Sequence, residues 1–455
     1  MGKDLTEGCS PHRKLAPDTV GSEARKPTSR RGIADKAKAD KQHRFRDLSG
    51  CLNVELLLDC WGDLNKDAAS GVDGVTWQAY AENLQANVKA LVERLKKKRY
   101  RAKLIRRCYI PKGNGQERPL GIPVVEDKLL QAACARLLTA IYEQEFLACS
   151  YGYRPGRGAG DAVRDLTFDL QYGRYGYVVE ADIQGFFDHM DHDWLLKMLR
   201  LRIDDRAFLG LIRKWLRAGV LETDGRVVHP DTGVPQGGVV SPVLANVYLH
   251  YALDLWFEKV VKPHCRGEAV SSRYADDFVC ALRFRSDAEW CYQVLPKRLG
   301  KFKLEGSPEK TRILRCSRFH PGMTRRFTFV GFEFFWKEDR QGVPRVKRRT
   351  ARKKLQSACK RIKEWIQANR HLPGQAFFNG LNARLRGHYR YYGVHGNSGA
   401  LSRFFAWATA CAFKWLNRRG GKRRSFSWAR FTQILDAIHR ERPRMTEVRR
   451  RRMFA

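Results

Sequence analysis

Three aspartates lie in sequence surroundings that suit metal-ion chemistry. Asp276 and Asp277 are adjacent acids between two short apolar runs, and Asp182 ends a third apolar run. A carboxylate at the edge of an apolar sheet is costly unless it is paired or binds a metal. Strands that deliver such carboxylates to one end of a sheet form an oxygen-rich pocket for hard divalent cations. Two such cations can activate a 3′-hydroxyl group and stabilise a pyrophosphate leaving group, so the predicted chemistry is nucleotidyl transfer.

The pattern of apolar residues predicts the elements that must position these acids. Strands are predicted over 108–111, 118–123, 177–182, 326–336 and, as two short runs meeting at the acidic pair, 273–280. The first two form a hairpin around a tight turn at 112–115. Helices are predicted twice within 53–98, then over 125–146, 194–201, 241–261 and most of the chain beyond 336. Because helices and strands mix without regular alternation, the predicted fold class is α+β, with a sheet domain followed by an α-helical domain.

The charge of the chain indicates a polyanionic partner. The 455 residues contain 86 Lys and Arg against 48 Asp and Glu, a formal net charge of +38, which excludes an ordinary metabolic enzyme. Residues 341–455 alone hold 29 Lys and Arg against 4 Asp and Glu, a net charge of +25. Aromatic residues such as Trp365, Tyr391 and Trp407 are interleaved with these cations. This composition is typical of a folded surface that binds phosphates and stacks unpaired bases.

Other composition features narrow the cellular setting. The chain has no apolar run long enough to span a membrane and no apolar core of a signal peptide near its first residues. Its 12 cysteines include no C-x-x-C pair, which favours reduced core thiols over a zinc site or a disulfide framework. The predicted location is the cytoplasm.

Eight ordered sequence blocks resemble those of group II intron-encoded reverse transcriptase/maturases. The blocks are A-S-G-V-D-G-V-T (69–76), Y-I-P-K-G-N-G-Q-E-R-P-L-G-I-P (109–123), Y-G-Y-R-P-G-R (151–157), A-D-I-Q-G-F-F-D (181–188), G-V-P-Q-G-G-V-V-S-P (233–242), Y-A-D-D (274–277), S-P-E-K-T (307–311) and L-N-A-R-L-R-G-H-Y-R-Y-Y-G (381–393). One short block would be weak evidence, but their order and spacing match nearly the whole chain from about residue 45. The resemblance implies a right-hand polymerase with an RNA-directed DNA polymerase activity.

The resemblance also implies roles for residues around the aspartates. It makes Asp182, Asp276 and Asp277, with the backbone carbonyl of Ile183, the ligands of two Mg²⁺ ions, with Mn²⁺ as an alternative. Supporting roles fall to the residues Tyr274, Ala275 and Lys310. Histidines 189 and 192 could suggest a separate metal site, but the clustered aspartates beside them are better explained as helix capping.

Four residues are predicted to bind the incoming deoxynucleoside triphosphate. Lys112 and Arg118 lie on opposite sides of the predicted hairpin, where a point charge and a planar fork could clamp one triphosphate. By resemblance, Phe187 is a steric gate that excludes a 2′-hydroxyl, and Gln236 packs against the sugar and base of the nucleotide. Alternatives are a core position for Phe187 and a backbone-bridging role for Gln236.

Predicted RNA contacts lie in two regions. Arg154 and Arg157 either contact the template backbone or brace the fingers. The second group follows from the resemblance to the maturase thumb and consists of Arg384, Arg386, Tyr389, Arg390 and Tyr391. The expected domains are a basic flexible extension (1–49), fingers with an N-terminal extension (50–176), a catalytic palm (177–340), an α-helical thumb/maturase domain (341–420) and a short basic DNA-binding tail (421–455).

The family pattern sets further expectations about partners. We expect intron RNA, a template–primer duplex, target DNA and deoxynucleoside triphosphates as partners, with the protein on the bacterial nucleoid when bound to DNA. Many relatives end in a zinc-supported H-N-H endonuclease, whose cysteine pairs this chain lacks, so we expect no endonuclease and a primer from elsewhere, such as a replication fork. Two alternatives are a splicing cofactor without polymerase activity, disfavoured by the intact aspartates, and a reverse transcriptase recruited to host defence. A small gate residue would indicate an RNA-directed RNA polymerase, but this chain has Phe187.

Overall fold

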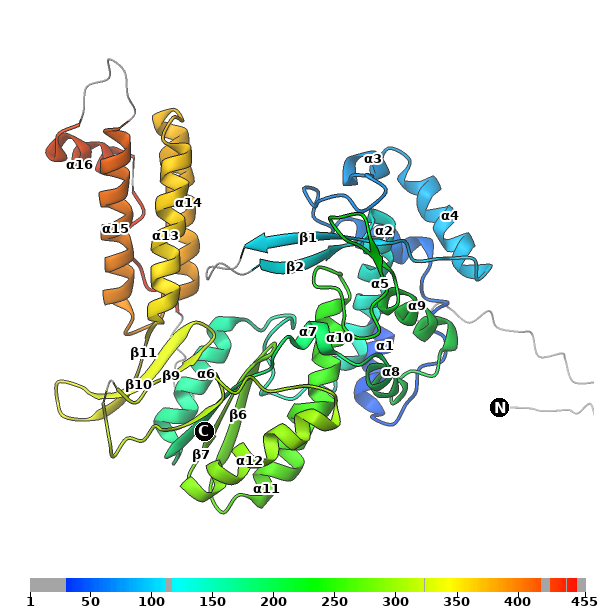
Figure 1. Cartoon of the computed structure of the whole chain (residues 1–455), viewed down its shortest axis with the longest axis horizontal. Helices are drawn as coiled ribbons and strands as arrows, with labels where there is room; N and C mark the ends of the chain where they lie inside the picture. Colours follow the sequence, from blue (N-terminus) through cyan, green and yellow to red (C-terminus); the bar gives the residue numbers. More distant parts are fainter. Residues whose placement is uncertain (1–29, 112–116, 323, 419–425, 439, 448–455) are drawn as a thin grey trace, which may run out of the picture.

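The computed structural model describes residues 30–111, 117–322, 324–418, 426–438 and 440–447, which form a mixed α/β structure (Figure 1). Helices pack around a central sheet, and a group of long helices near the C-terminus stands beside it. Figure 1 also shows a hairpin that extends from the N-terminal helices toward these long helices. Within the described residues, no helix is both long enough and apolar enough to cross a membrane.

The central sheet contains four antiparallel strands in the order β6-β7-β3-β8. They are β3 (Tyr177–Asp182), β6 (Ala269–Tyr274), β7 (Asp277–Leu282) and β8 (Arg312–Arg315). Side chains of β3 enter two cores: Val179 and Ala181 pack on the side of α12 (Arg285–Lys301), and Val178 packs on the side of α6 (Ala159–Tyr172). Burial on both faces explains why residues 177–181 are apolar except for Glu180, and it confirms the predicted strand.

A second sheet contains the predicted hairpin. Strands β1 (Ile105–Pro111) and β2 (Glu117–Ile122) pair in antiparallel fashion, with Arg106 opposite Ile122. The short strands β4 (Val220–Leu221) and β5 (Val227–Val228) extend the sheet beyond β1. The strands of the hairpin are confirmed, whereas its turn, with Lys112, lies outside the described residues.

The predicted strand over 326–336 is two strands rather than one. Strands β9 (Phe327–Phe329) and β10 (Phe332–Glu338) are joined by a tight turn at Val330 and Gly331. The next strand, β11 (Pro344–Thr350), pairs with β10 in a segment predicted to be helical. Side chains at 346, 348 and 350 of β11 are buried, whereas the cations between them are not. The many cations of this segment hide its alternation of buried and exposed residues in the sequence.

The N-terminal part is helical and more ordered than expected. Its helices are α1 (Arg30–Ala39), α2 (Val54–Trp61), α3 (Trp77–Ala81), α4 (Leu84–Lys96) and α5 (Val125–Tyr142). Ile33 and Ala37 of α1 are buried, and α1 packs on α5. The prediction of a flexible extension is therefore wrong for residues 30–49, and residues 1–29 lie outside the described part.

Several helices complete the middle of the chain. They are α7 (Phe186–His189), α8 (His192–Arg200), α9 (Arg206–Leu216), α10 (Ser241–Leu249) and α11 (Lys262–His264). The predicted helix over 241–261 is present, but two π-helical turns, η1 (His250–Asp254) and η2 (Phe257–Val261), follow α10. Helices α6, α9 and α12 were not predicted, although α9 buries apolar residues at helical spacing, such as Phe208, Ile212 and Trp215.

Four helices form what we call the C-terminal bundle: α13 (Arg352–Asn369), α14 (Gly374–Tyr392), α15 (Ser398–Leu416) and α16 (Trp428–Ala437). The bundle has its own apolar core, to which Ile366, Phe377 and Leu401 contribute. The helical prediction for 341–420 is confirmed from Arg352 onward, after β11. Helix α16 lies within the segment predicted as a basic tail.

Candidate active site

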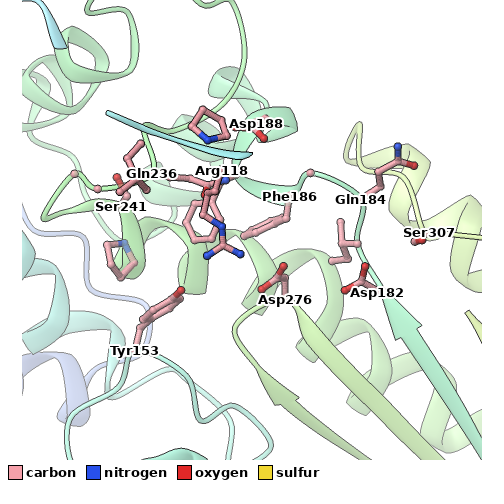
Figure 2. A pocket seen from close by; sticks show the side chains of 18 of the residues that line it. Arg118, Tyr153, Asp182, Gln184, Phe186, Asp188, Gln236, Ser241, Asp276 and Ser307 are labelled. Atoms are coloured by element: carbon pink, nitrogen blue, oxygen red, sulfur yellow. The ribbon is translucent and has the colours of Figure 1, made fainter. Parts of the chain in front are cut away.

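The pairing of the central strands brings the predicted catalytic aspartates to one end of the sheet. Asp182 ends β3 directly opposite Asp277, the first residue of β7. Asp276 lies in the turn between β6 and β7. Figure 2 shows the side chains of Asp182 and Asp276 on neighbouring strand ends, both facing a cavity of about 520 Å³.

Asp277 differs from the other two aspartates in its surroundings. Its Oδ2 accepts a hydrogen bond of 2.8 Å from the backbone N–H of Val330. It lines a second cavity of about 400 Å³, which Asp182 and Asp276 also border. The structure thus brings all three carboxylates together, but only Asp182 and Asp276 face the larger cavity.

The site disfavours further negative charge. Burial, followed by the nearby charges of Asp276 and Asp182, raises the pKa of Asp277 to about 7, although the Val330 N–H opposes this shift. Burial and the charge of Asp182 also raise the pKa of Asp276. A cation would relieve this repulsion, and Lys310 partly does so, with its Nζ 2.6 Å from Oδ2 of Asp182.

The donor set fits a hard divalent cation in part. Asp182 and Asp276 supply carboxylate oxygen atoms at the cavity, as such cations require, and Ile183 also lines it. Among the described residues, no three Asp, Glu, His or Cys side chains are gathered closely enough to form one metal cluster. The predicted direct ligation by Asp277 therefore has weaker support than that by the other two, because its carboxylate is held by Val330.

The turn that carries Asp276 is held by a buried arginine that the sequence analysis did not identify. Ala275 has a left-handed backbone conformation, with φ of +56°. Arg273, which is fully buried, donates from Nη1 to the carbonyl of Ala275 (2.9 Å). It also donates to both carboxylate oxygens of Asp254 (2.7 and 2.6 Å), to Oδ1 of Asn246 and to Oγ of Ser150. Every guanidinium nitrogen is therefore bonded.

Tyr274 belongs to the same turn. It pairs with Asp277 in the β6–β7 register, and its neighbour Ala275 is almost fully buried. The supporting roles of Tyr274 and Ala275 remain predictions. Gly152 packs so closely on this turn that a Cβ there would lie 2.4 Å from the backbone nitrogen of Ala275.

Three of the four predicted nucleotide-binding residues line the cavity with Asp182 and Asp276. Arg118 comes from β2, Phe187 from α7 and Gln236 from the loop before α10. Figure 2 shows the Arg118 guanidinium directed into this space. The loop lies close to β2, because the N–H of Gly121 donates to the carbonyl of Gln236 (2.7 Å). Lys112 lies outside the described residues.

Three aromatic residues line this cavity: Tyr153, Phe186 and Phe187. Phe186 is buried in the core and also borders the cavity. The half-buried Phe187 lines the cavity and packs edge-on against Phe186, with ring centroids 5.3 Å apart. Tyr153, 51% exposed, faces Phe187 from the other side with centroids 6.5 Å apart. The sequence analysis missed Tyr153, although the Y-G-Y-R-P-G-R block around it was a signal.

The predicted RNA contacts have different outcomes. Arg154 is nearly buried and donates to the carboxylate of Glu143 and to the carbonyls of Leu147 and Ser150. This geometry selects the bracing role and contradicts a template contact. Arg157 lies over the Tyr151 ring, 4.4 Å from its centroid, and donates to the same Ser150 carbonyl.

The residues of the C-terminal bundle that were predicted to contact RNA differ in their exposure. Tyr389 is fully buried, so the prediction that it contacts RNA is wrong. The side chains of Arg384, Arg386 and Arg390 are exposed on α14. Arg386 is paired with Glu441 (3.0 Å), and Arg384 lies 4.0 Å from the centroid of the Trp365 ring.

The histidines near Asp182 are structural. Asp191 caps α8 by accepting from the N–H of Trp194 (2.8 Å), as predicted. His192 is buried, and its Nε2 donates to the carbonyl of Gly233 (2.7 Å). Neither observation supports a second metal site.

Comparison with known proteins defines the class of this chain. The sequence profile of the family described as reverse transcriptase (RNA-dependent DNA polymerase) matches residues 110–334. Protein YkfC of Escherichia coli K12 is 33% identical over 309 residues, which cover 61% of this chain and 78% of the relative. The group II intron-encoded protein LtrA of Lactococcus lactis is 31% identical over 313 residues, 56% of this chain and 51% of LtrA. An uncharacterised 91 kDa protein in the cob intron of Schizosaccharomyces pombe is 39% identical over 170 residues, which cover 37% of this chain and 21% of the relative.

The chain belongs to the group II intron-encoded reverse transcriptase/maturase family. Its fold class is accordingly the right-hand polymerase fold, and enzymes of this family use divalent metal ions. The chain spans about half the length of LtrA.

Proposed function

We propose that this chain extends a DNA 3′ end on an RNA template at the cavity between Asp182 and Asp276. The observation that supports this proposal is that Asp182 and Asp276 share one cavity with Arg118, Phe187 and Gln236. Residues 50–176 then serve as fingers, 177–340 as the palm and the C-terminal bundle as the thumb.

Each residue has a distinct task in this mechanism. Asp182, Asp276, Asp277 and the Ile183 carbonyl would hold two Mg²⁺ ions, or Mn²⁺ in their place. When bound, these ions would make the primer 3′-hydroxyl a better nucleophile and neutralise charge on the leaving pyrophosphate. Arg118 binds the triphosphate through its planar fork, and Gln236 contacts the sugar and base. Correct placement of the triphosphate makes its attack effectively unimolecular, which supplies much of the catalysis.

A primer-extension assay tests this function. The full-length protein should extend a DNA primer annealed to an RNA template when given deoxynucleoside triphosphates and Mg²⁺. No extension with either Mg²⁺ or Mn²⁺ would contradict the proposal. Extension on DNA templates alone would contradict its RNA-directed character.

Replacing Phe187 with alanine should admit ribonucleotides. The ring lines the cavity next to Asp188 and opposite Tyr153, so its removal opens room for a 2′-hydroxyl. We expect the preference for deoxynucleotides over ribonucleotides to fall by about a hundredfold, equivalent to losing a steric penalty of about 3 kcal/mol. Competition between dCTP and CTP in single-nucleotide addition measures this ratio. The control Phe168→Ala alters an exposed ring on α6 and should leave the ratio unchanged. Unchanged discrimination in Phe187→Ala would return the residue to a packing role.

We also propose that the C-terminal bundle binds group II intron RNA as a maturase and helps it to splice. Helix α13 begins with Arg352, Lys353 and Lys354 and has no acid in its first turn. Cations there oppose the helix dipole, so helix stability does not explain them. All three side chains are exposed, as are Lys360, Arg361 and Lys363 further along the helix. An anionic partner such as RNA does explain this surface.

Binding to structured intron RNA should therefore weaken steeply with salt. Each phosphate neutralised releases counterions and adds about 0.7–0.9 to the slope of log affinity against log salt. Replacing Lys353, Lys354 and Arg361 with glutamine should make the slope shallower by about two to three. A filter-binding titration between low and physiological salt measures the slope. A flat dependence for the wild type would contradict the role of the bundle.

The finer biological setting belongs to the same proposal. Retrohoming would use target DNA as partner and primer, on the nucleoid of a bacterial cytoplasm. The short tail after residue 421 would contact that DNA.

A further inference from the structure

A strained turn connects the catalytic end of the central sheet to the C-terminal bundle. Phe329 pairs with Phe332, so Val330 and Gly331 are the two central residues of the β9–β10 hairpin. Both have positive φ angles, +50° and +78°. This is the backbone of a type I′ turn, which normally takes Asn or Asp followed by Gly. A β-branched residue in the left-handed region is an outlier that costs folding free energy.

Contacts on both sides hold the Val330 residue in this conformation. Its N–H donates to Oδ2 of Asp277 (2.8 Å), and its carbonyl accepts from the hydroxyl of Tyr391 on α14 (3.2 Å). The carbonyl of Gly331 accepts from the N–H of Ala351, the residue before α13 (3.0 Å). One turn therefore joins a carboxylate of the sheet to two helices of the bundle.

Tyr391 is suited to this contact. Its ring stacks on Phe332, with centroids 6.1 Å apart and planes 11° apart, so the ring is oriented by β10. Burial, with a contribution from the charge of Asp277, raises the pKa of Tyr391, so its hydroxyl remains protonated and able to donate. The same side chain is 43% exposed, on the helix that carries the exposed arginines 384, 386 and 390.

We propose that Tyr391 is a positioning residue that acts through the Val330–Gly331 turn on Asp277. The seating of the C-terminal bundle then sets the orientation of this carboxylate. Binding of a duplex to the bundle would thus change the orientation of this carboxylate at the catalytic end of the sheet. The inference rests on the proposed polymerase function and adds a regulatory link to it.

Single-turnover addition of one deoxynucleotide tests the link. The variant Tyr391→Phe keeps the ring and removes only the hydroxyl. At saturating duplex and nucleotide, we expect its rate to fall about fivefold, the effect of one neutral hydrogen bond. Duplex affinity should stay within about twofold, because the exposed ring is retained.

The neighbouring tyrosine supplies a matched control. Tyr392 lies on the same helix, its ring is 5.2 Å from that of Phe332, and its hydroxyl lies beside Gly331. Tyr392→Phe should add nucleotide at the wild-type rate. The proposal is overturned if Tyr391→Phe is no slower than this control. It is equally overturned if Tyr391→Phe loses only duplex affinity and reaches the wild-type rate at saturation.

A second measurement does not depend on activity. A double-mutant cycle of Tyr391→Phe and Asp277→Ala compares the unfolding equilibrium constant of the double variant with that expected from the two single variants. The two values should differ by at least about twofold, because both side chains bond to the same residue. Additive effects would overturn the link even if the enzyme is active. A wild type that extends no primer would instead contradict the proposed function and leave this cycle interpretable.

Discussion

Replacing Asp276 with asparagine should reduce single-nucleotide addition by at least about a thousandfold, because the loss of one metal-binding charge is expected to remove about 4 kcal/mol of transition-state stabilisation. The substitution keeps the side-chain volume and removes the charge. Asp276 is the aspartate of the β6–β7 turn that faces the larger cavity together with Asp182. Rapid-quench measurements of one addition, at saturating duplex and nucleotide, give the rate directly.

The same substitution should leave the protein as stable as the wild type or more stable. Burial and the charge of Asp182 raise the pKa of Asp276 in the folded protein, so its ionised form costs folding free energy at neutral pH. That cost is present above the folded pKa and disappears as the pH falls and the group is protonated. Removing the charge removes the cost. If the melting temperature of Asp276→Asn falls together with its activity, the lost activity results from misfolding and the assignment of Asp276 is contradicted.

A surface aspartate provides the comparison. Asp224 is exposed and paired with Arg226 in a turn between β4 and β5. Asp224→Asn should change neither rate nor stability by more than about twofold, as for other exposed ion pairs. An Asp276→Asn enzyme that retains a tenth of the wild-type rate would exclude Asp276 as a ligand required for catalysis.

Replacing Arg273 with methionine should have the largest effect on stability. The side chain is fully buried with Asp254, so the substitution leaves a buried carboxylate without its partner. Breaking such a pair costs about 3–5 kcal/mol. The free energy of unfolding, measured by urea denaturation, should fall by this amount. Arg285→Met disrupts an exposed Arg285–Glu289 pair and should cost less than about 1 kcal/mol.

A double variant separates the stability of the pair from its role in the site. Arg273→Met combined with Asp254→Leu replaces the ion pair with apolar side chains and should recover much of the lost stability. We expect polymerisation to remain low, because the carbonyl of Ala275 has lost its donor and the turn that carries Asp276 is no longer held. Full activity in a stable double variant would show that Arg273 does not position the turn.

Several residues facing the cavity could be predicted from the sequence because each lies in a short local pattern, although Tyr153 was missed. The strand ending at Asp182 was predicted to the residue, since only Glu180 interrupts the apolar residues before that acid. The Asp276–Asp277 pair and Phe187 lie within recognisable blocks, and those blocks lie at chain turns beside the sheet.

The supporting residues depend on contacts between distant parts of the chain and could not be predicted in this way. Arg273 tolerates burial only because Asp254 lies opposite it, 19 residues earlier in the sequence. Tyr389 and Tyr391 belong to one aromatic-basic pattern, yet the helix buries one and directs the other toward Val330. Strand β11 is masked by its cations, and α1 by its polar face.

The π-helical turn η1 positions the acid that pairs with Arg273. Asp254 closes η1, a π-helical turn, and such turns are what a single inserted residue produces within an α-helix. Removing one codon from this turn would rotate Asp254 by about 100° away from the guanidinium. The Asp254–Arg273 ion pair therefore depends on the wide turn of η1 as well as on the two side chains.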